Sequence, residues 1–338
     1  MRLVLFAPNI HTGGGLVLLR AVLKADELPP LVLFVDARAL DDLTLPDSAQ
    51  RIVVQPSLRD RFKAQWALRS LVCSDDVVLC LHGVPPLLKN KGRVVVFQQN
   101  RLVLGCGALS GYPLRSGIQI MLNRLSSRLL RNRVQTWVVQ TPSMRRDLEI
   151  WHGHRPDVRV LPFADTSRTG PLNAREDPQW DFVFVSDGMP HKNHKRLLEA
   201  WCVLASDGVR PSLALTLGPR DALLAKMVTE VTRTNGLRVR NLGHLAHHEV
   251  MSLYRRSRAL IFPSTIESFG LPLVEATASG LPIIAPELDY VRDVCVPATT
   301  FDAHSAVSIA RAVRRFLGLD DSPAQLCSAN DFVREVCR

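Results

Sequence analysis

Several features that define other classes of protein are missing from this sequence. Its seven cysteines form no C-x-x-C pair, and an odd number without such a pair argues against a zinc site or a disulfide framework. No apolar run reaches the ~18 residues of a membrane-spanning helix, and the opening run from Met1 to Pro8 does not have the form of a signal peptide. The D-x-D motif, a carboxylate pair that could hold a catalytic metal, is also absent. We therefore expect a protein of the reducing cytosol that uses neither a metal nor a cofactor.

Acidic residues are missing from a long internal stretch. Between Asp76 and Asp147 the sequence contains eleven Lys and Arg residues and no Asp or Glu. Residues 1–165 hold 22 basic and 13 acidic residues, a net charge of +9, whereas residues 166–338 hold 20 and 19. Because a solvated surface usually mixes the two signs, this stretch predicts contact with an anionic partner.

The length of the chain and the order of its apolar runs predict two α/β domains. At 338 residues the chain is too long for one ordinary hydrophobic core. Strand-like runs alternate with helical or loop stretches in both halves, which predicts parallel sheets covered on both faces. Residues 165–179 are polar and contain Pro and Gly, so we place the boundary there, between domains 1–165 and 166–318. The expected strands are residues 3–7, Leu31–Val35, Arg51–Val54, Val77–Leu81, Val94–Phe97, Thr136–Val139, Asp181–Val185, Leu213–Leu217, Leu237–Leu242, Arg258–Phe262, Pro282–Ala285 and Thr300–Phe301.

Residues 114–131 have the periodicity of an amphipathic helix, with six apolar residues on one face and three arginines on the other. In the ordinary interpretation the apolar face packs on the core and the basic face is solvated. In the alternative, the helix docks on anionic lipid headgroups, or its basic residues bind a lipid-linked pyrophosphate. The apolar residues are Leu114, Ile118, Met121, Leu122, Leu125 and Leu129, and the arginines are Arg124, Arg128 and Arg131.

The stretch from Pro263 to Ala276 carries the most specific signal. A strand-like run ends at Pro263, and a helix is expected to begin at Pro272, because proline suits the first helical position. The N-terminus of a helix can hold a phosphate without any metal, and a nearby carboxylate suits the two hydroxyls of a ribose. Glu267 and Glu275, eight residues apart, therefore predict a site for a nucleotide diphosphate that carries a sugar. A glutamate at a helix start can also serve only to compensate the helix dipole.

This stretch closely resembles the E-x7-E segment of family 4 glycosyltransferases, which are retaining enzymes of the GT-B fold. Residues Leu242–Leu245 and Ala278–Ala285 match that family too. The resemblance implies two Rossmann-like α/β/α domains that face a central cleft, with the nucleotide sugar held mainly by the second domain and the acceptor by the first. It further implies that residues 319–338 form a helix that packs back on the N-terminal domain.

The resemblance also implies roles for residues of the second domain. Glu267 would be catalytic, orienting the donor sugar and stabilising its positively charged ring carbon, and Glu275 would hold the ribose. Lys192 would pair with the pyrophosphate, and it stands out because a lysine at a helix start is unfavourable for the dipole. The remaining donor-binding residues, at the helix tip, would be Phe269, Gly270 and Leu271.

In the first domain, Gly13, Gly14 and Gly15 form a glycine-rich turn between a strand and a helix. The motif G-x-G-x-x-G is not present, because Leu18 stands where its third glycine would fall. A simple tight turn would explain the glycines. The resemblance implies instead that they let the backbone approach the donor closely.

Two further positions follow strands of the first domain. By the resemblance His82, at the carboxyl end of its strand, would be catalytic and would reach the donor sugar, although a lone histidine there can be merely structural. Residues 98–101 depart from the family, since many relatives carry a histidine or an acid there. A catalytic base is therefore not expected at this position. We expect Asn100 and Arg101 to contact the acceptor, or else to be ordinary loop residues.

The predicted reaction moves a sugar, with retention of configuration, from a UDP- or GDP-sugar to a glycan or a lipid-pyrophosphate acceptor. We expect a role in bacterial surface polysaccharide or lipopolysaccharide synthesis, with peripheral contact to an anionic membrane at the cytoplasmic face of the inner membrane. One alternative is a sugar-nucleotide epimerase on the same scaffold. Another is a basic nucleic-acid-binding protein, which the 6% aromatic content disfavours. A third is a degenerate transferase that only binds, since Ser186-Asp187 replaces the Gly-Arg of many relatives.

Overall fold

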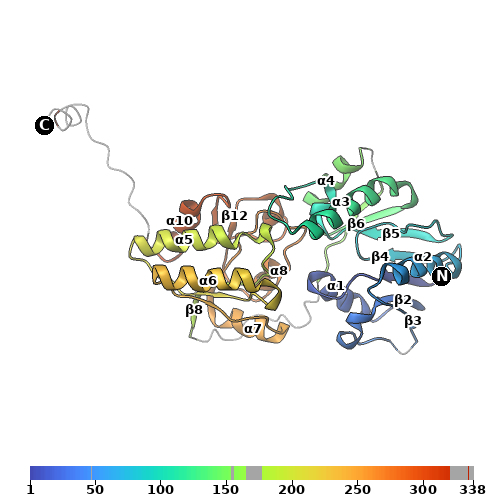
Figure 1. Ribbon diagram of the computed structural model, residues 1–338, viewed down its shortest axis with the longest axis horizontal. Coiled ribbons are helices and arrows are strands. Elements are labelled where there is room, and N and C mark those ends of the chain that lie inside the picture. Colours follow the sequence, from blue (N-terminus) through green and yellow to red (C-terminus); the bar gives the residue numbers. More distant parts are fainter. Residues whose placement is uncertain (47, 154–155, 165–176, 320–333, 335–338) are drawn as a thin grey trace.

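The computed structural model describes residues 1–46, 48–153, 156–164, 177–319 and 334. These residues form two α/β domains, each built on a parallel sheet with helices packed against it (Figure 1). The predicted two-domain α/β architecture is therefore confirmed.

The N-terminal sheet has seven parallel strands in the order β3-β2-β1-β4-β5-β6-β7. Its central strands are nearly continuous apolar runs, because helices and loops cover both faces; all six residues of β2 are buried. Every strand predicted in this half is present. The bounds are β1 (Leu3–Ala7), β2 (Leu31–Asp36), β3 (Gln50–Val54), β4 (Val77–Cys80), β5 (Arg93–Phe97), β6 (Thr136–Val139) and β7 (Val158–Val160).

Helices divide the core of this domain into two layers. On one face of the sheet, α1 (Gly13–Leu23) packs through Leu19 against residues such as Leu33. On the other face, α2 (Leu58–Leu71) and α4 (Pro142–His152) contribute Leu68 and Leu148 to a second cluster, which also contains Phe34 of β2. Short 3-10 turns connect these elements, at η1 (Ala37–Asp42), η2 (Arg101–Leu104) and η3 (Arg131–Arg133).

The predicted amphipathic helix is present as α3 (Leu114–Leu129), but its apolar face is exposed instead of packed on the core. The six apolar residues of its predicted core face are exposed, whereas Ile120 and Ser127 are its buried residues. Of its arginines, Arg124 is partly buried and its Nε donates to the Leu102 carbonyl at 2.8 Å, whereas Arg128 is exposed, with its guanidinium 5.4 Å from the Trp151 ring. Periodicity identified the two faces, but the neighbours of the helix decided which of them is covered.

The C-terminal sheet has six parallel strands in the order β10-β9-β8-β11-β12-β13. The strands predicted in this half are found within a few residues of their expected bounds. These are β8 (Trp180–Phe184), β9 (Leu213–Leu215), β10 (Val239–Asn241), β11 (Ser257–Ile261), β12 (Ile283–Pro286) and β13 (Thr299–Phe301).

One continuous hydrophobic core holds the C-terminal domain together. Phe182 of β8 lies edge-on to Trp201 and Phe316, which come from the neighbouring helices α5 and α10. Figure 1 shows α5 and α6 side by side, running along the C-terminal domain toward the N-terminal domain. The helical elements are η4 (Pro190–Lys192), α5 (His194–Ser206), η5 (Pro219–Asp221), α6 (Ala222–Asn235), α7 (His247–Arg255), α8 (Leu271–Ala278), α9 (Asp289–Arg292) and α10 (Ala306–Phe316).

Two predictions about domain limits fall largely outside the described residues. The boundary between residues 165 and 166 lies in the stretch 165–176, and the expected C-terminal helix 319–338 is described only at residues 319 and 334. Both stay predictions. Within the described ranges, no helix combines the length and the apolar character needed to cross a bilayer.

Candidate active site

Both sheets have the strand order of a doubly wound fold, and this order locates the site. In each sheet the first strand lies next to the fourth, so the loops that follow these two strands separate at the carboxyl edge and leave room for a ligand. In the N-terminal sheet the loop after β1 leads directly into Gly13–Gly15, which the structure places in the first turn of α1 and not in a separate turn, and the loop after β4 contains His82. In the C-terminal sheet they are residues 185–193, after β8, and residues 262–270, after β11.

The segment after β11 leads into α8 through a left-handed turn. Gly270 has φ 76° and ψ 65°, a conformation that a residue with a side chain rarely adopts, and α8 begins at the next residue. The helix therefore begins one residue before the predicted start, and Pro272 is its second residue. The backbone N–H groups of Gly270 and Leu271 donate to no described residue, so the tip of α8 presents free donors and the positive end of the helix dipole.

Glu267 forms an ion pair with Lys192. Lys192 Nζ lies 2.6 Å from Glu267 Oε1, and the two side chains are only 16% and 10% exposed. Both residues are predicted to lie at the donor, but the sequence does not predict that they pair with each other. The contact joins the loop after β8 to the loop after β11 at the edge where these loops separate.

The loop that carries Lys192 is fixed by the residue that follows it. Asn193 has φ 65° and is the only described non-glycine residue with a positive φ. Its side-chain amide donates to the carbonyls of Pro263 and Ala303 at 3.1 and 2.7 Å. The backbone N–H of Thr265 in turn donates to the His191 carbonyl at 2.8 Å. These bonds offset the cost of the left-handed conformation, so Lys192 is held against Glu267 by the backbone of both loops.

Glu275 lies on α8 and contacts two side chains of α7. The Tyr254 hydroxyl donates to Glu275 Oε2 at 3.2 Å, and His247 Nε2 lies 3.3 Å from Glu275 Oε1. Tyr254 is fully buried, and burial followed by the charge of Glu275 raises its pKa well above the usual value. Tyr254 therefore stays a hydrogen-bond donor and fixes the orientation of the carboxylate.

The two domains touch directly beside Glu267. Ser268 Oγ donates to the Gln99 carbonyl at 2.6 Å, and Thr141 Oγ1 donates to the Ser268 carbonyl at 3.3 Å. A second contact joins α4 to the C-terminal domain, where the backbone N–H of Ser143 donates to Asp293 Oδ2 at 2.8 Å. The segment that carries Glu267 thus lies at the boundary between the domains.

The glycine-rich first turn of α1 approaches the same helix tip. A Cβ atom on Gly14 would lie 3.3 Å from Leu271 Cδ1, so this turn and the start of α8 are in close contact across the boundary. Gly13 has φ 66°, with no atom within 4 Å of a Cβ built there, and the Cβ of Gly15 would lie 3.5 Å from Gln99 Oε1. Only a small residue fits at position 14 without displacing Leu271.

His82 is half-buried at the carboxyl end of β4. Its Nδ1 lies 3.3 Å from the Phe6 carbonyl, a contact that requires a proton on Nδ1. Burial lowers the pKa of the imidazole to about 4. The ring is therefore neutral at pH 7, and its Nε2 is a hydrogen-bond acceptor.

A family model described as "Glycosyl transferases group 1" matches residues 171–330. These residues are a group 1 glycosyl transferase domain. Among relatives in sequence, the serotype-specific mannosyltransferase WbdA of Escherichia coli is 31% identical over 154 residues, or 44% of this chain and 18% of WbdA. The O-antigen chain mannosyltransferase B of Escherichia coli is 30% identical over 115 residues, or 33% of this chain and 30% of that protein. The chain therefore spans less than a third of either relative.

Solved glycosyltransferase structures resemble both domains together. Sucrose-phosphate synthase from Thermosynechococcus elongatus superposes with a TM-score of 0.72 at 16% identity, covering 94% of this chain and 90% of that one. HepE from Anabaena, solved with UDP and glucose, superposes with a TM-score of 0.66 at 15% identity, again covering 94% and 90%. Such likeness establishes the fold alone, and the fold is the predicted GT-B fold.

The glycosyl transferase domain departs from the family pattern in the loop after β8. Ser186 Oγ donates to the Asp187 carbonyl at 2.8 Å, and Asp187 Oδ1 accepts from the Met189 N–H at 3.3 Å. These bonds stabilise the turn but supply no positive charge. Arg196, a nearby cation that could replace the missing arginine, pairs with Glu199 at 2.5 Å. Among the described residues, no group of three His, Cys, Asp or Glu side chains is arranged to hold a metal.

Asn100 and Arg101 are engaged within the N-terminal domain. Asn100 Oδ1 accepts from the Leu102 N–H at 3.0 Å and caps η2. Arg101 Nε lies 2.5 Å from Asp147 Oδ2, with both side chains 17% exposed. These contacts favour a structural role for both residues, although Asn100 itself is exposed.

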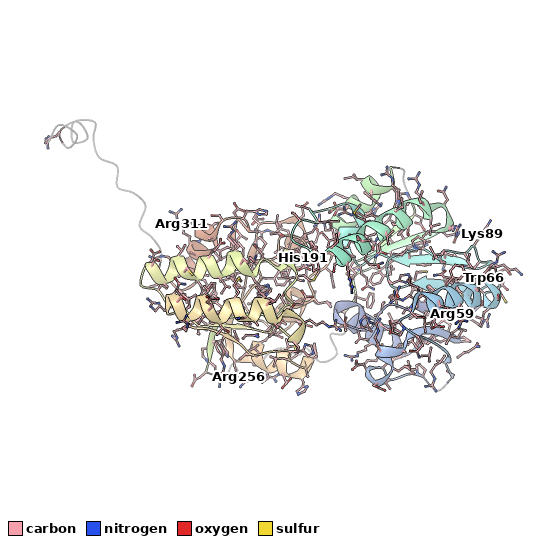
Figure 2. The ribbon with its side chains drawn as sticks, in the orientation of Figure 1. Arg59, Trp66, Lys89, His191, Arg256 and Arg311 are labelled. Atoms are coloured by element: carbon pink, nitrogen blue, oxygen red, sulfur yellow. The ribbon has the colours of Figure 1, made fainter. Side chains whose placement is uncertain are left out.

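A contact that the sequence did not predict crosses between the domains at His191. The Tyr112 hydroxyl lies 2.7 Å from His191 Nδ1, and the two rings are nearly parallel at 11°. Figure 2 shows His191 on the side of the glycosyl transferase domain that faces the N-terminal domain. His247 and Tyr254 were also missed as partners of Glu275. No local pattern marks these residues, because each meets its partner through the tertiary fold.

Proposed function

We propose that this protein is a retaining glycosyltransferase that moves a sugar from a UDP- or GDP-sugar to a glycan or lipid-linked acceptor. The observation that carries this proposal is the pair of acids on the β11–α8 segment. Glu267 lies at the domain boundary against Lys192, and Glu275 is held by Tyr254 and His247. The names of the relatives, which are O-antigen and serotype-specific mannosyltransferases, support a role in bacterial surface polysaccharide synthesis.

The donor's diphosphate would bind at the tip of α8. The free N–H groups of Gly270 and Leu271 are available there, and Lys192 is a cation that the loops fix in place. Glu267 holds the Lys192 ammonium in place before a donor binds. Binding of the phosphates would therefore cost less side-chain entropy at Lys192. The close packing of Gly14 on Leu271 leaves the glycine-rich backbone beside the same phosphates.

The ribose would bind at Glu275. An ionised carboxylate accepts up to about four hydrogen bonds, and Tyr254 and His247 account for one on each oxygen. The remaining lone pairs can accept hydrogen bonds from the two ribose hydroxyls. A ribose placed there and a diphosphate at the helix tip would direct the sugar toward Glu267 and the N-terminal domain.

The reaction would proceed by front-face attack on the donor sugar. The bond between the anomeric carbon and the diphosphate oxygen breaks, the acceptor oxygen bonds to that carbon from the same side, and the acceptor proton passes to the departing phosphate. Free N–H groups at the helix tip and Lys192 would stabilise the charge that grows on the leaving group. Glu267 would stabilise the positive ring carbon, and neutral His82 would accept a hydrogen bond from a sugar hydroxyl through Nε2. No step requires a metal.

The test is a donor panel measured with the full chain. Thermal shift with UDP-, GDP- and ADP-sugars should single out one base, and transfer to a glycan or lipid-linked acceptor should give a product with the donor's anomeric configuration by NMR. Activity should persist in EDTA. Turnover of the donor without any acceptor would favour an epimerase. The absence of any stabilisation by nucleotide sugars would overturn the proposal.

A further inference from the structure

The outer face of α3 is a continuous apolar surface, here called the α3 stripe. Its six side chains are spaced three or four positions apart along the helix, apart from the adjacent pair at 121 and 122, and are 48–80% exposed. Soluble monomers rarely expose so many large apolar side chains in one place. The stripe consists of Leu114, Ile118, Met121, Leu122, Leu125 and Leu129.

The cations around the stripe are not neutralised. Arg124 and Arg131 donate to backbone carbonyls, and Arg128 lies over the Trp151 ring. Within the described part of the chain, neither these three arginines nor Arg115 forms an ion pair with a carboxylate. The helix itself contains no Asp or Glu. An apolar face with uncompensated positive charge beside it fits a surface that is apolar within and anionic at its rim.

We propose that the α3 stripe docks on the surface of a lipid bilayer rich in anionic headgroups. The apolar side chains enter the boundary between headgroups and acyl chains, while the arginines stay at the level of the headgroup phosphates. This inference deepens the proposed function and rests on it only for the lipid-linked nature of the acceptor. The docking itself is a property of the surface and can be tested without any sugar transfer.

Charge disfavours a second copy of the chain as the occupant. Two α3 helices packed on each other would bring Arg115, Arg124 and Arg128 of one copy near those of the other, with no acid on either helix. Like charges in such an interface cost binding energy. Anionic lipid meets the same arginines with opposite charge.

A second exposed apolar row lies on α2, at Leu58, Phe62 and Trp66. It has three members rather than six, and Asp60 lies beside it in an ion pair with Lys63. Figure 2 shows Trp66 at the end of the N-terminal domain away from the C-terminal domain. The α2 row is therefore the natural competitor in an experiment.

The α3 stripe, in contrast, begins beside the active site. Tyr112, two residues before α3, contacts His191, the neighbour of Lys192. A Cβ atom on Gly107, in the loop before α3, would lie 3.2 Å from Ile266, the neighbour of Glu267. A bilayer held by the stripe would thus present a lipid-linked acceptor near the boundary where Glu267 lies.

The experiment measures co-sedimentation of the full chain with unilamellar vesicles. We expect binding to phosphatidylcholine vesicles that contain about 30% phosphatidylglycerol, weaker binding to phosphatidylcholine alone, and a decrease as NaCl is raised. The variant Ile118→Ser/Met121→Ser/Leu125→Ser should lose binding by about tenfold or more. The matched control Leu223→Ser/Val296→Ser removes apolar side chains that are 88% and 89% exposed in the C-terminal domain, and it should bind like the wild type.

Three results would overturn the proposal. The α3 variant could bind vesicles as well as the wild type, or Phe62→Ser/Trp66→Ser could abolish binding while the α3 variant keeps it. Sedimentation velocity could instead show a wild-type dimer that the α3 variant dissociates, which would make the stripe an interface between copies. Thermal shift with the nucleotide sugar is measured on each variant: its absence in the wild type counts against the proposed function, not against the docking surface.

Discussion

Lys192 Nζ and Glu267 Oε1 lie 2.6 Å apart, although 75 residues separate them in the sequence. The strand order separates the loop after β8 from the loop after β11, and this contact joins the two loops. Each side chain is mostly buried, so each depends on the other for its charge partner. The two groups proposed to act on the diphosphate and on the sugar are thus positioned as one unit.

Changing Glu267 to Gln should lower kcat by about 100-fold or more, because it removes the charge proposed to stabilise the transition state. The KM for the donor should change much less. Steady-state kinetics with the preferred nucleotide sugar measure both, and Glu287→Gln, which alters an exposed glutamate paired with Arg292, is the control. The double variant Lys192→Gln/Glu267→Gln should restore thermal stability without restoring kcat. Full recovery of kcat would contradict a catalytic role.

Substitution of Glu275 or Tyr254 should weaken donor binding and leave the turnover rate nearly unchanged. Glu275→Gln is expected to raise the donor KM by about tenfold, and Tyr254→Phe, which removes the 3.2 Å bond to Oε2, by about threefold. Titration calorimetry with the free nucleoside diphosphate should show the same losses. Glu199→Gln, on the exposed face of α5, should bind normally. Wild-type affinity in Glu275→Gln would remove the ribose assignment.

The contact between Ser143 N–H and Asp293 Oδ2 should hold the domains together. Asp293→Ala is expected to lower the free energy of unfolding by about 1 kcal/mol, since it removes a carboxylate cap from the start of α4. Amide exchange should increase in the first turn of α4. Asp289→Ala is the comparison: its ion pair with Arg146 is exposed on both sides, and such pairs contribute little. Equal exchange in both variants would contradict this role.

Stability should fall as the pH is lowered from 6.5 toward 4, in part because of His194. This side chain is 3% exposed, and burial lowers its pKa from 6.5 to about 4. The unfolded chain therefore takes up the proton first as the pH falls, and the folded state loses stability throughout this window. His194→Leu should flatten the urea-unfolding profile by on the order of 3 kcal/mol between these pH values. His248→Leu, at an exposed position, is the comparison, and an unchanged slope in His194→Leu would contradict the assignment.

Sequence patterns were sufficient for the sheets and for choosing the residues of the proposed donor site. The first five residues of β2 are all apolar because both faces of the strand are buried, and such a run can be recognised in the sequence within a few residues. Proline and glycine at the start of α8 likewise marked the helix start to within one residue. Glu267, Glu275 and Lys192 could be singled out because the loops and the helix start that carry them are local features.

Tertiary structure alone decided what these elements meet. The amphipathic period of α3 defined an apolar face, but Ile120 and Ser127 are the residues that the fold buries, and the apolar face stays exposed. The contacts of Tyr112 with His191 and of Glu275 with Tyr254 join residues 79 and 21 positions apart. Periodicity and turn chemistry act over a few residues, whereas these contacts depend on how whole elements and domains pack. The sequence therefore determined the two folds and the acids at their edge, and packing determined the partners of those acids and the surface that stayed uncovered.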